Sequence, residues 1–157
     1  MNKKVVIIMG SKADLDWANK IVSVLNDLGI ESVTRIASAH KVPLKCYNLI
    51  KEYEKENVVF ITIAGMSNAL SGFTDAQTNC PVIACPPYSD KFGGGDIFSS
   101  IRMPSGVAPL TVISPDNAAL AAAKIIGLSN PDVQEKVTAF QEKKRDDLEA
   151  ADASIQS

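Results

Sequence analysis

Short apolar runs alternate with amphipathic stretches along the chain. Continuous apolar runs that end in Gly, Ser or Pro are typical of strands buried on both faces of a parallel sheet. Strands are predicted at residues 5–9, 31–37, 58–64, 81–85 and 110–113. Apolar residues three or four positions apart predict helices at 15–28, 44–54, 68–78, 96–102 and 115–127, and from 131 to about 149.

The alternation of strands and helices predicts an α/β fold with a parallel sheet covered on both faces. We expect a three-layer, doubly wound, flavodoxin-like order in a single domain, residues 1–157. Gly29 is placed to end the first helix, and Ser114-Pro115 to begin the alanine-rich one.

The stretch from Pro131 predicts an extra C-terminal helix with sparse apolar positions. Two interpretations remain open for it: packing on a neighbouring subunit of a homo-oligomer, or a half-exposed surface helix. Residues 150–157 are predicted to form a disordered tail.

Composition narrows the classes of partner and compartment. A net charge of −2 argues against nucleic acid as the main partner but allows a local phosphate site. Three cysteines without a C-x-x-C motif or a signal peptide indicate a reducing cytoplasm, with Cys80 and Cys85 as buried structural thiols. A single histidine argues against a conventional zinc site, and no apolar stretch is long enough for a membrane span.

Polar segments follow the predicted strands at 10–14, 38–41, 65–68 and 86–95. In open α/β sheets, ligands bind beyond the carboxyl ends of the strands, so these segments define the predicted site. The segment 10–14 opens a helix whose free N–H groups attract phosphate, although Ser11 or Asp14 could simply cap that helix. Asp14 is also placed to hold ribose hydroxyls. Neither a dinucleotide fingerprint nor a P-loop motif occurs.

The segment 38–41 brings a hydroxyl, an imidazole and an ammonium group together. Ser38 and Lys41 are candidates for the second half of a phosphate clamp. His40 is the only side chain here whose ordinary pKa lies near neutrality, which favours a proton-transfer role over a structural one. The small residues at 65–68 permit close approach of a ligand or cap a helix, and the loop 86–95 is either a lid or a connection.

Taken in order, these segments resemble the aminoimidazole ribonucleotide (AIR) carboxylase and mutase family of purine biosynthesis. The resemblance covers residues 5–130 and rests on residues 9–14, 38–41, 63–72, 84–87, 99–106 and 117–119. The class I mutases carry Arg after Ser-Ala-His and a histidine in the third-strand loop. Lys41 and the loop Gly65-Met66-Ser67-Asn68 instead resemble class II, the direct carboxylases, and the carboxylase part of the bifunctional animal enzyme.

The resemblance implies a carboxy-lyase that joins CO2 to AIR without biotin, ATP, metal or other cofactor. By motif match, Ser11, Ser38 and Lys41 hold the phosphate and Asp14 holds the ribose. The base and CO2 pocket is formed by Gly65, Ser67, Asn68 and Ala69. His40 is assigned as the base that removes the proton from ring carbon 4. The family also implies an octamer with sites made partly by neighbouring subunits.

Three other functions remain open. The first is the mutase of the same family, which moves a carboxyl group within the carboxylated nucleotide. The second is a non-catalytic, flavodoxin-like nucleotide-binding module, because a fold does not fix a function. The third, a purely structural oligomer, leaves the polar strand ends unexplained.

Overall fold

The computed structural model describes residues 4–156 and contains one parallel sheet. The sheet order is β2-β1-β3-β4-β5, which confirms the predicted doubly wound, flavodoxin-like arrangement. The strands are β1 (Val5–Met9), β2 (Ser32–Ile36), β3 (Val59–Ile63), β4 (Val82–Ala84) and β5 (Leu110–Thr111). β1 lies between β2 and β3, with Val5 opposite both Ser32 and Val59.

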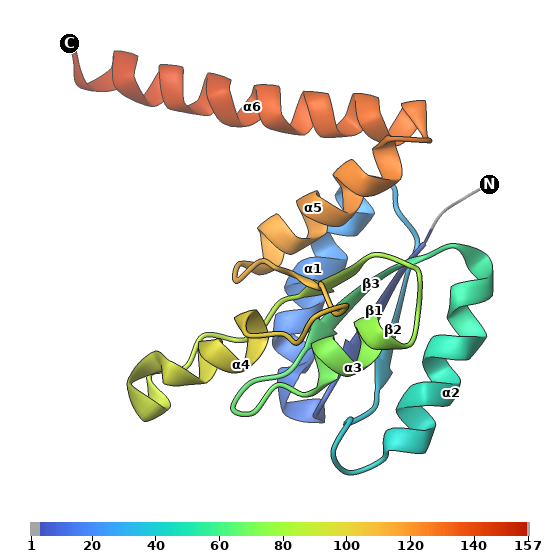
Figure 1. The fold of residues 1–157 in the computed structure, drawn as a ribbon. Helices are drawn as coiled ribbons and strands as arrows, with labels where there is room; N and C mark the ends of the chain where they lie inside the picture. The colour runs from blue at the N-terminus through green and yellow to red at the C-terminus, as the bar shows by residue number, and fades with distance from the viewer. Residues whose placement is uncertain (1–3, 157) are drawn as a thin grey trace.

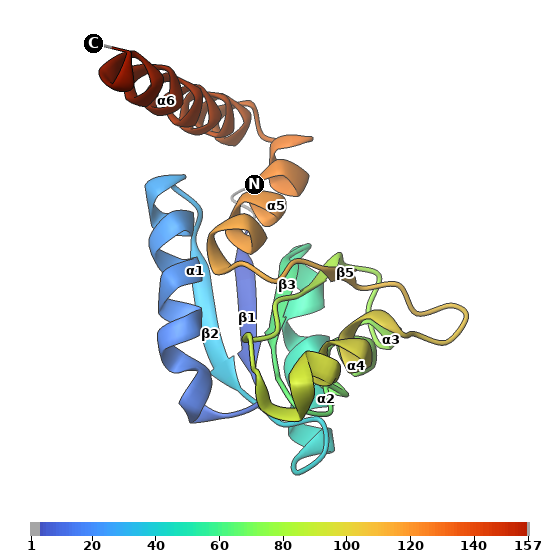
Figure 2. The same cartoon turned by 90° about the vertical axis from the view of Figure 1, so that its left-hand side faces the viewer.

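Helices cover both faces of this sheet, as the alternating pattern predicts (Figures 1 and 2). They are α1 (Leu15–Asp27), α2 (Pro43–Tyr53), α3 (Leu70–Ala76), α4 (Phe98–Ile101), α5 (Pro115–Gly127) and α6 (Pro131–Ile155). Short 3-10 turns form η1 (Lys12–Asp14), η2 (Glu54–Glu56) and η3 (Lys91–Ile97). Most bounds lie within two residues of the predicted ones, because apolar runs extend past the last paired residue.

The alternating side chains of β1 divide the core into two parts. Val5, Ile7 and Met9 pack with α1 and α5, whereas Val6 and Ile8 pack with α2 and α3. On the first face, α5 buries Ile126 together with four small side chains that let it approach the sheet. These are Ala118, Ala119, Ala122 and Ala123, all fully buried.

α1 ends at a glycine, as predicted. Gly29 has a φ of 69°, a left-handed conformation that other residues adopt only with strain. Its N–H donates to Asn26 O at 2.9 Å, and the Ile30 N–H donates to Leu25 O at 2.8 Å. This pair of bonds is the Schellman motif, and it turns the chain directly into β2.

All three cysteines are free thiols, and they differ in burial. Cys46 and Cys85 are fully buried, and desolvation raises the pKa of each thiol to about 11. Cys80 is only half-buried, so the prediction of a buried thiol is correct for Cys85 but too strong for Cys80.

α6 is longer than predicted and extends away from the sheet (Figure 1). It continues to Ile155 instead of fading near Glu149, so the predicted disordered tail is helical over 150–155. A sequence rich in Ala, Glu and Lys sustains a helix even where no apolar face marks it. Only Val133 and Val137 of this helix are buried. Within residues 4–156, no helix is both long and apolar enough to cross a membrane.

Candidate active site

Three predicted segments leave the sheet side by side at its carboxyl edge. The strand ladder extends past the strand ends: the Ala37 N–H donates to Met9 O, and the Gly10 N–H donates to Ile63 O, both at 2.9 Å. The segments that follow β2, β1 and β3 are therefore neighbours, in that order across the sheet. The structure thus brings 10–14, 38–41 and 65–68 to one edge, as the sequence predicts. The third of these lies in the connection 64–69 between β3 and α3.

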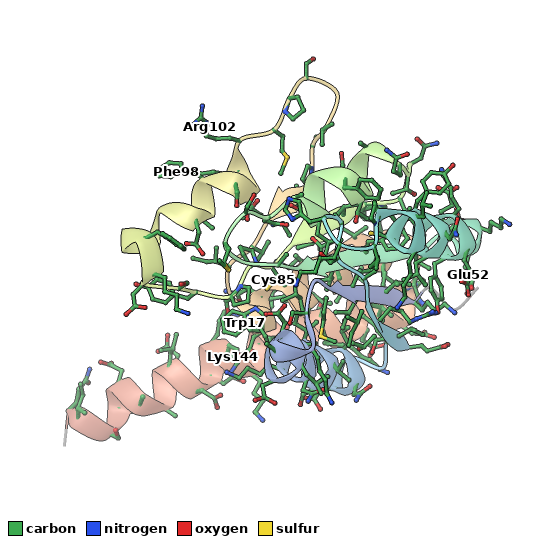
Figure 3. All side chains as sticks on the ribbon, turned by 90° about the horizontal axis from the view of Figure 1, so that it is seen from below. Trp17, Glu52, Cys85, Phe98, Arg102 and Lys144 are labelled. Atoms are coloured by element: carbon green, nitrogen blue, oxygen red, sulfur yellow. The ribbon has the colours of Figure 1, made fainter. Side chains whose placement is uncertain are left out.

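The end of β4 is fixed to the same edge through α1. The Cys85 N–H donates to Thr62 O at 2.8 Å, and Cys85 O accepts the indole N–H of Trp17 at 3.2 Å. Figure 3, which views the molecule from below, shows Trp17 and Cys85 close together. The loop that begins at Pro86 therefore starts beside the other three segments.

The segment after β1 caps its own turn. Ser11 Oγ accepts the Ala13 N–H at 3.2 Å, and Ser11 O accepts the Asp14 N–H at 3.3 Å. Partial burial raises the pKa of Asp14, and an interaction with the Ser11 backbone opposes that rise. The capping interpretation is thus correct for Ser11, which stays exposed to a ligand, whereas the Asp14 side chain makes no capping bond to α1.

The segment after β2 presents free side chains. Ser38 Oγ accepts the Lys41 N–H at 3.2 Å, and Ser38 O accepts the Val42 N–H at 3.0 Å, which forms a tight turn before α2. His40 and Lys41 are both exposed. Across residues 4–156, neither the imidazole nor the ammonium group has a hydrogen-bond or ion-pair partner. Both groups are therefore available to a ligand.

The segment after β3 is held by the protein instead. Asn68 is 4% exposed, and its side chain donates to Ser100 Oγ at 2.9 Å and accepts the Ser71 N–H at 3.2 Å. The amide thus serves the start of α3 and the packing of α4. Ser67 is exposed, whereas Gly65 and Ala69 are half-buried. Of the four predicted pocket residues, Asn68 is the one whose side chain is already occupied.

The loop 86–95 borders a pocket of about 270 Å³ next to this segment. Gly65, Pro87 and Asp96 line it, and Asp96 Oδ2 accepts the Met66 N–H at 3.4 Å. Phe92, Gly93 and Gly94 all have left-handed backbone conformations, with φ between 58° and 75°. The loop is therefore a folded turn in this structure, and its opening and closing as a lid stays a prediction.

A larger pocket, of about 570 Å³, lies at the opposite end of the sheet. It is lined by residues that precede β3 and β4, such as Asn57 and Pro81. Lys51, a cation in its wall, already donates to Glu54 Oε1 at 3.0 Å and to Gln77 O at 2.5 Å. Because its cation is neutralised and no predicted site residue lines it, size alone does not make it the functional site.

Sequence reasoning gave no role to the residues of α4 that hold the 64–69 segment. Ser99 and Ser100 contact it from more than thirty positions further along the chain. Their only signal in the sequence is membership of the 99–106 motif. Phe98 and Arg102, from the same stretch, point away from the body of the molecule (Figure 3). In the part of the chain that the structure describes, no group of three or more His, Cys, Asp or Glu side chains is placed to hold a metal ion.

The fold is that of a doubly wound α/β protein, a class in which ligands bind beyond the carboxyl ends of the strands. Residues 4–147 match the family model described as AIR carboxylase, and the chain belongs to that family. The resemblance noted in the sequence is thereby confirmed.

Named relatives are similar along almost the whole chain. The phosphoribosylaminoimidazole carboxylase of Archaeoglobus fulgidus is 65% identical over 152 residues, which cover 97% of this chain and 84% of that protein. The enzyme of the same name from Treponema denticola is 48% identical and covers 90% of this chain and 91% of its own length. The crystal structure of Treponema denticola PurE has a TM-score of 0.96 at 44% identity, with 99% of each chain covered.

Proposed function

We propose that this chain catalyses the carboxylation of AIR by CO2 in purine biosynthesis, giving 4-carboxy-5-aminoimidazole ribonucleotide. The observation that carries the proposal is the convergence of the 10–14, 38–41 and 64–69 segments at one sheet edge. The carboxylase names of relatives 65% and 48% identical support the same reaction.

The nucleotide is held by the first two segments. Ser11, Ser38 and Lys41 bind the phosphate, since two hydroxyls and a free ammonium group lie at adjacent strand ends. The nearby N-terminus of α2, which begins at Pro43, adds a favourable partial positive charge. Asp14 accepts hydrogen bonds from the ribose hydroxyls.

The base and CO2 occupy the pocket beside the third segment. Gly65, Ser67 and Ala69 form its wall, and Asn68 contributes by holding this segment in place, because its side chain is bonded to Ser71 and Ser100. This division of the site, charged groups after β1 and β2 and small residues after β3, suits a ligand with an anionic end and a flat ring.

The reaction needs one new bond and one proton transfer. Ring carbon 4 of the electron-rich aminoimidazole attacks the carbon of CO2, and a carboxylate forms as one C–O π pair moves to oxygen. The proton on ring carbon 4 then moves to a nitrogen of His40, which restores the aromatic ring. Holding the two reactants together supplies much of the remaining rate enhancement. The imidazole is exposed and has no partner within residues 4–156, so it is free to take the proton and pass it to solvent.

Two differences from the sequence pattern of the mutases favour the carboxylase over the mutase of the same family. Lys41 stands where the mutases have Arg, and Ser67 and Asn68 stand in a loop that has no histidine. A non-catalytic nucleotide-binding module is disfavoured by the placement of His40 beside the phosphate ligands.

The active form is a homo-oligomer in the cytoplasm, an octamer by the family resemblance. The outer half of α6 supports an oligomer because Leu148 and Ile155 are 72% and 81% exposed. Free thiols suit a reducing compartment. Light scattering of the purified chain measures the subunit number directly.

A paired-substrate assay tests the reaction. The chain is supplied either with AIR and CO2, or with the N-carboxylated isomer under CO2-free conditions, and the carbon-carboxylated product is followed in each. We expect turnover of AIR with CO2 alone. Turnover of the isomer alone assigns the mutase, and AIR binding without turnover of either substrate assigns a binding module.

A further inference from the structure

One hydroxyl group holds both sides of the bend at Ser67. Ser99 Oγ donates to Met66 O at 3.1 Å and accepts the Asn68 N–H at 2.9 Å. The same hydroxyl lies 2.7 Å from Asp96 O, so its single proton is shared between two carbonyls. Both peptide units that flank Ser67 are therefore tied to one oxygen atom on α4.

This contact fixes the direction of the Ser67 backbone. In a trans peptide unit, the C=O and N–H groups point in opposite directions. Because Met66 O points at Ser99, the Ser67 N–H points away from α4. The Ser67 C=O also points away and accepts the Ala69 N–H at 3.0 Å. Within residues 4–156, the Ser67 N–H itself has no partner, and Ser67 is exposed.

The bend also needs stabilising contacts from residues outside it. Met66 has a φ of 60°, in the left-handed region that is unfavourable for a residue with a side chain, and it is 65% exposed. Its own side chain therefore does little to hold the conformation. Such conformations persist where surrounding contacts over-determine them. Two contacts on Met66 supply this. The Ser99 hydroxyl donates to Met66 O, and Asp96 Oδ2 accepts the Met66 N–H.

We propose that Ser99 is a positioning residue that aims the Ser67 N–H at the carboxylate formed from CO2. The inference rests on the proposed function, because it takes the 65–69 segment as the wall of the CO2 pocket. Negative charge develops on the CO2 oxygens as ring carbon 4 attacks, and a pre-aimed backbone N–H stabilises that charge without reorganisation. Ser99 touches neither reactant and acts through the backbone of Ser67.

The test compares Ser99→Ala with Ser99→Thr. Thr keeps the hydroxyl, and in a helix its Oγ1 can bond a carbonyl three residues earlier, as Ser99 does with Asp96 O. Ser23→Ala, on the exposed face of α1, is the matched control. For each variant, the rate is measured against CO2 concentration, AIR affinity by calorimetry, and exchange of the Asn68 amide proton by NMR.

We expect Ser99→Ala to lower kcat/KM for CO2 by about 10- to 100-fold while AIR affinity stays unchanged. Ser99→Thr and Ser23→Ala should behave like the parent chain. Exchange of the Asn68 amide should accelerate only in Ser99→Ala. A general loss of structure would instead reduce kcat and the AIR-binding fraction together and leave KM for CO2 unchanged, and that pattern would overturn the positioning role.

Two further results keep the inference separate from the proposed function. If Ser99→Ala does not fold, Ser99→Cys replaces it, because Cys keeps the size of the side chain and weakens both hydrogen bonds. We then expect a smaller loss in kcat/KM, and an unchanged kcat/KM would overturn the inference. If the parent chain does not carboxylate AIR, the proposed function fails. The exchange measurement still decides whether Ser99 fixes the bend: unchanged exchange in Ser99→Ala rejects it.

Discussion

The loop after β2 and the loop after β3 lie at the same edge of the sheet but are built in opposite ways. In the first, His40 and Lys41 are exposed and hold no protein partner within residues 4–156. In the second, Asn68 is buried and the backbone is bonded to Ser99 and Asp96. The loop after β2 offers exposed ionisable side chains, and the loop after β3 offers a backbone that is fixed by hydrogen bonds.

Sheet topology explains the difference. β2 is an edge strand, so the chain that leaves it has a neighbour on one side only. β3 lies between β1 and β4, and the loop that follows it is overlaid by the segment that leads to α4. A central strand end can therefore be pinned by later parts of the chain, whereas an edge strand end stays open to solvent and ligand.

Replacing the imidazole tests the loop after β2 most severely. His40→Asn should lower the rate of AIR carboxylation by about 10²- to 10⁴-fold, because Asn cannot take the proton from ring carbon 4. AIR affinity and Tm should stay near the parent values, since the His40 ring is exposed. Steady-state kinetics with calorimetric AIR binding measure both. Near-normal turnover in this variant would remove His40 from the mechanism.

Removing the neighbouring ammonium group should affect binding more than chemistry. Lys41→Ala should weaken AIR binding by about 10- to 100-fold, the range expected for loss of a charged hydrogen bond. Lys41→Arg is the matched control, because it keeps the charge and the reach to a phosphate. Calorimetry at two salt concentrations is the measurement. Equal affinity of the Ala and Lys forms would place the phosphate elsewhere.

Substitution in the loop after β3 should lower the free energy of unfolding. Asn68→Ala leaves the Ser71 N–H and the buried Ser100 hydroxyl without partners, so we expect a loss of about 1–3 kcal/mol in the free energy of unfolding. Ser38→Ala, in the loop after β2, should change it by less than about 0.5 kcal/mol. Urea denaturation of both variants gives the comparison. Similar losses in the two variants would contradict the contrast between the loops.

The smallest expected effect is a pH dependence at Asp14. Partial burial raises the pKa of its carboxyl above the ordinary value of 3.8. The protonated form is thus favoured in the folded state, and this contribution to stability is complete below the unfolded pKa and lost as pH rises through the folded pKa. The Tm of Asp14→Asn relative to the parent chain should therefore increase between about pH 3 and pH 7. A relative Tm that falls over this range would show that the interaction with the Ser11 backbone dominates.

The sequence predicts well those features that depend on neighbouring residues. The run Val5–Met9 is both the apolar segment and the paired strand, and Gly29 ends α1 where the pattern places it. Pro115 begins α5 as expected, although Ser114 makes no side-chain capping bond. The parallel direction of the strands follows from the helical crossovers between them.

The sequence does not reveal contacts made across long separations. The burial of Asn68 depends on Ser100, and the bend at Met66 depends on Ser99, both set by how the chain returns after β4. The final turns of α6 were missed because their helical tendency lies in charged and alanine residues without an apolar period. In both cases the local sequence pattern does not indicate the interaction that decides the structure.

The indole at the edge of the site has a practical consequence for spectroscopy. Trp17 is the only tryptophan in the chain, it is half-buried, and its N–H bonds to a carbonyl 68 residues further on. Its fluorescence therefore reports the moment at which the start of α1 and the end of β4 come together. Refolding followed by emission and by far-ultraviolet circular dichroism should separate this long-range step from the formation of helices.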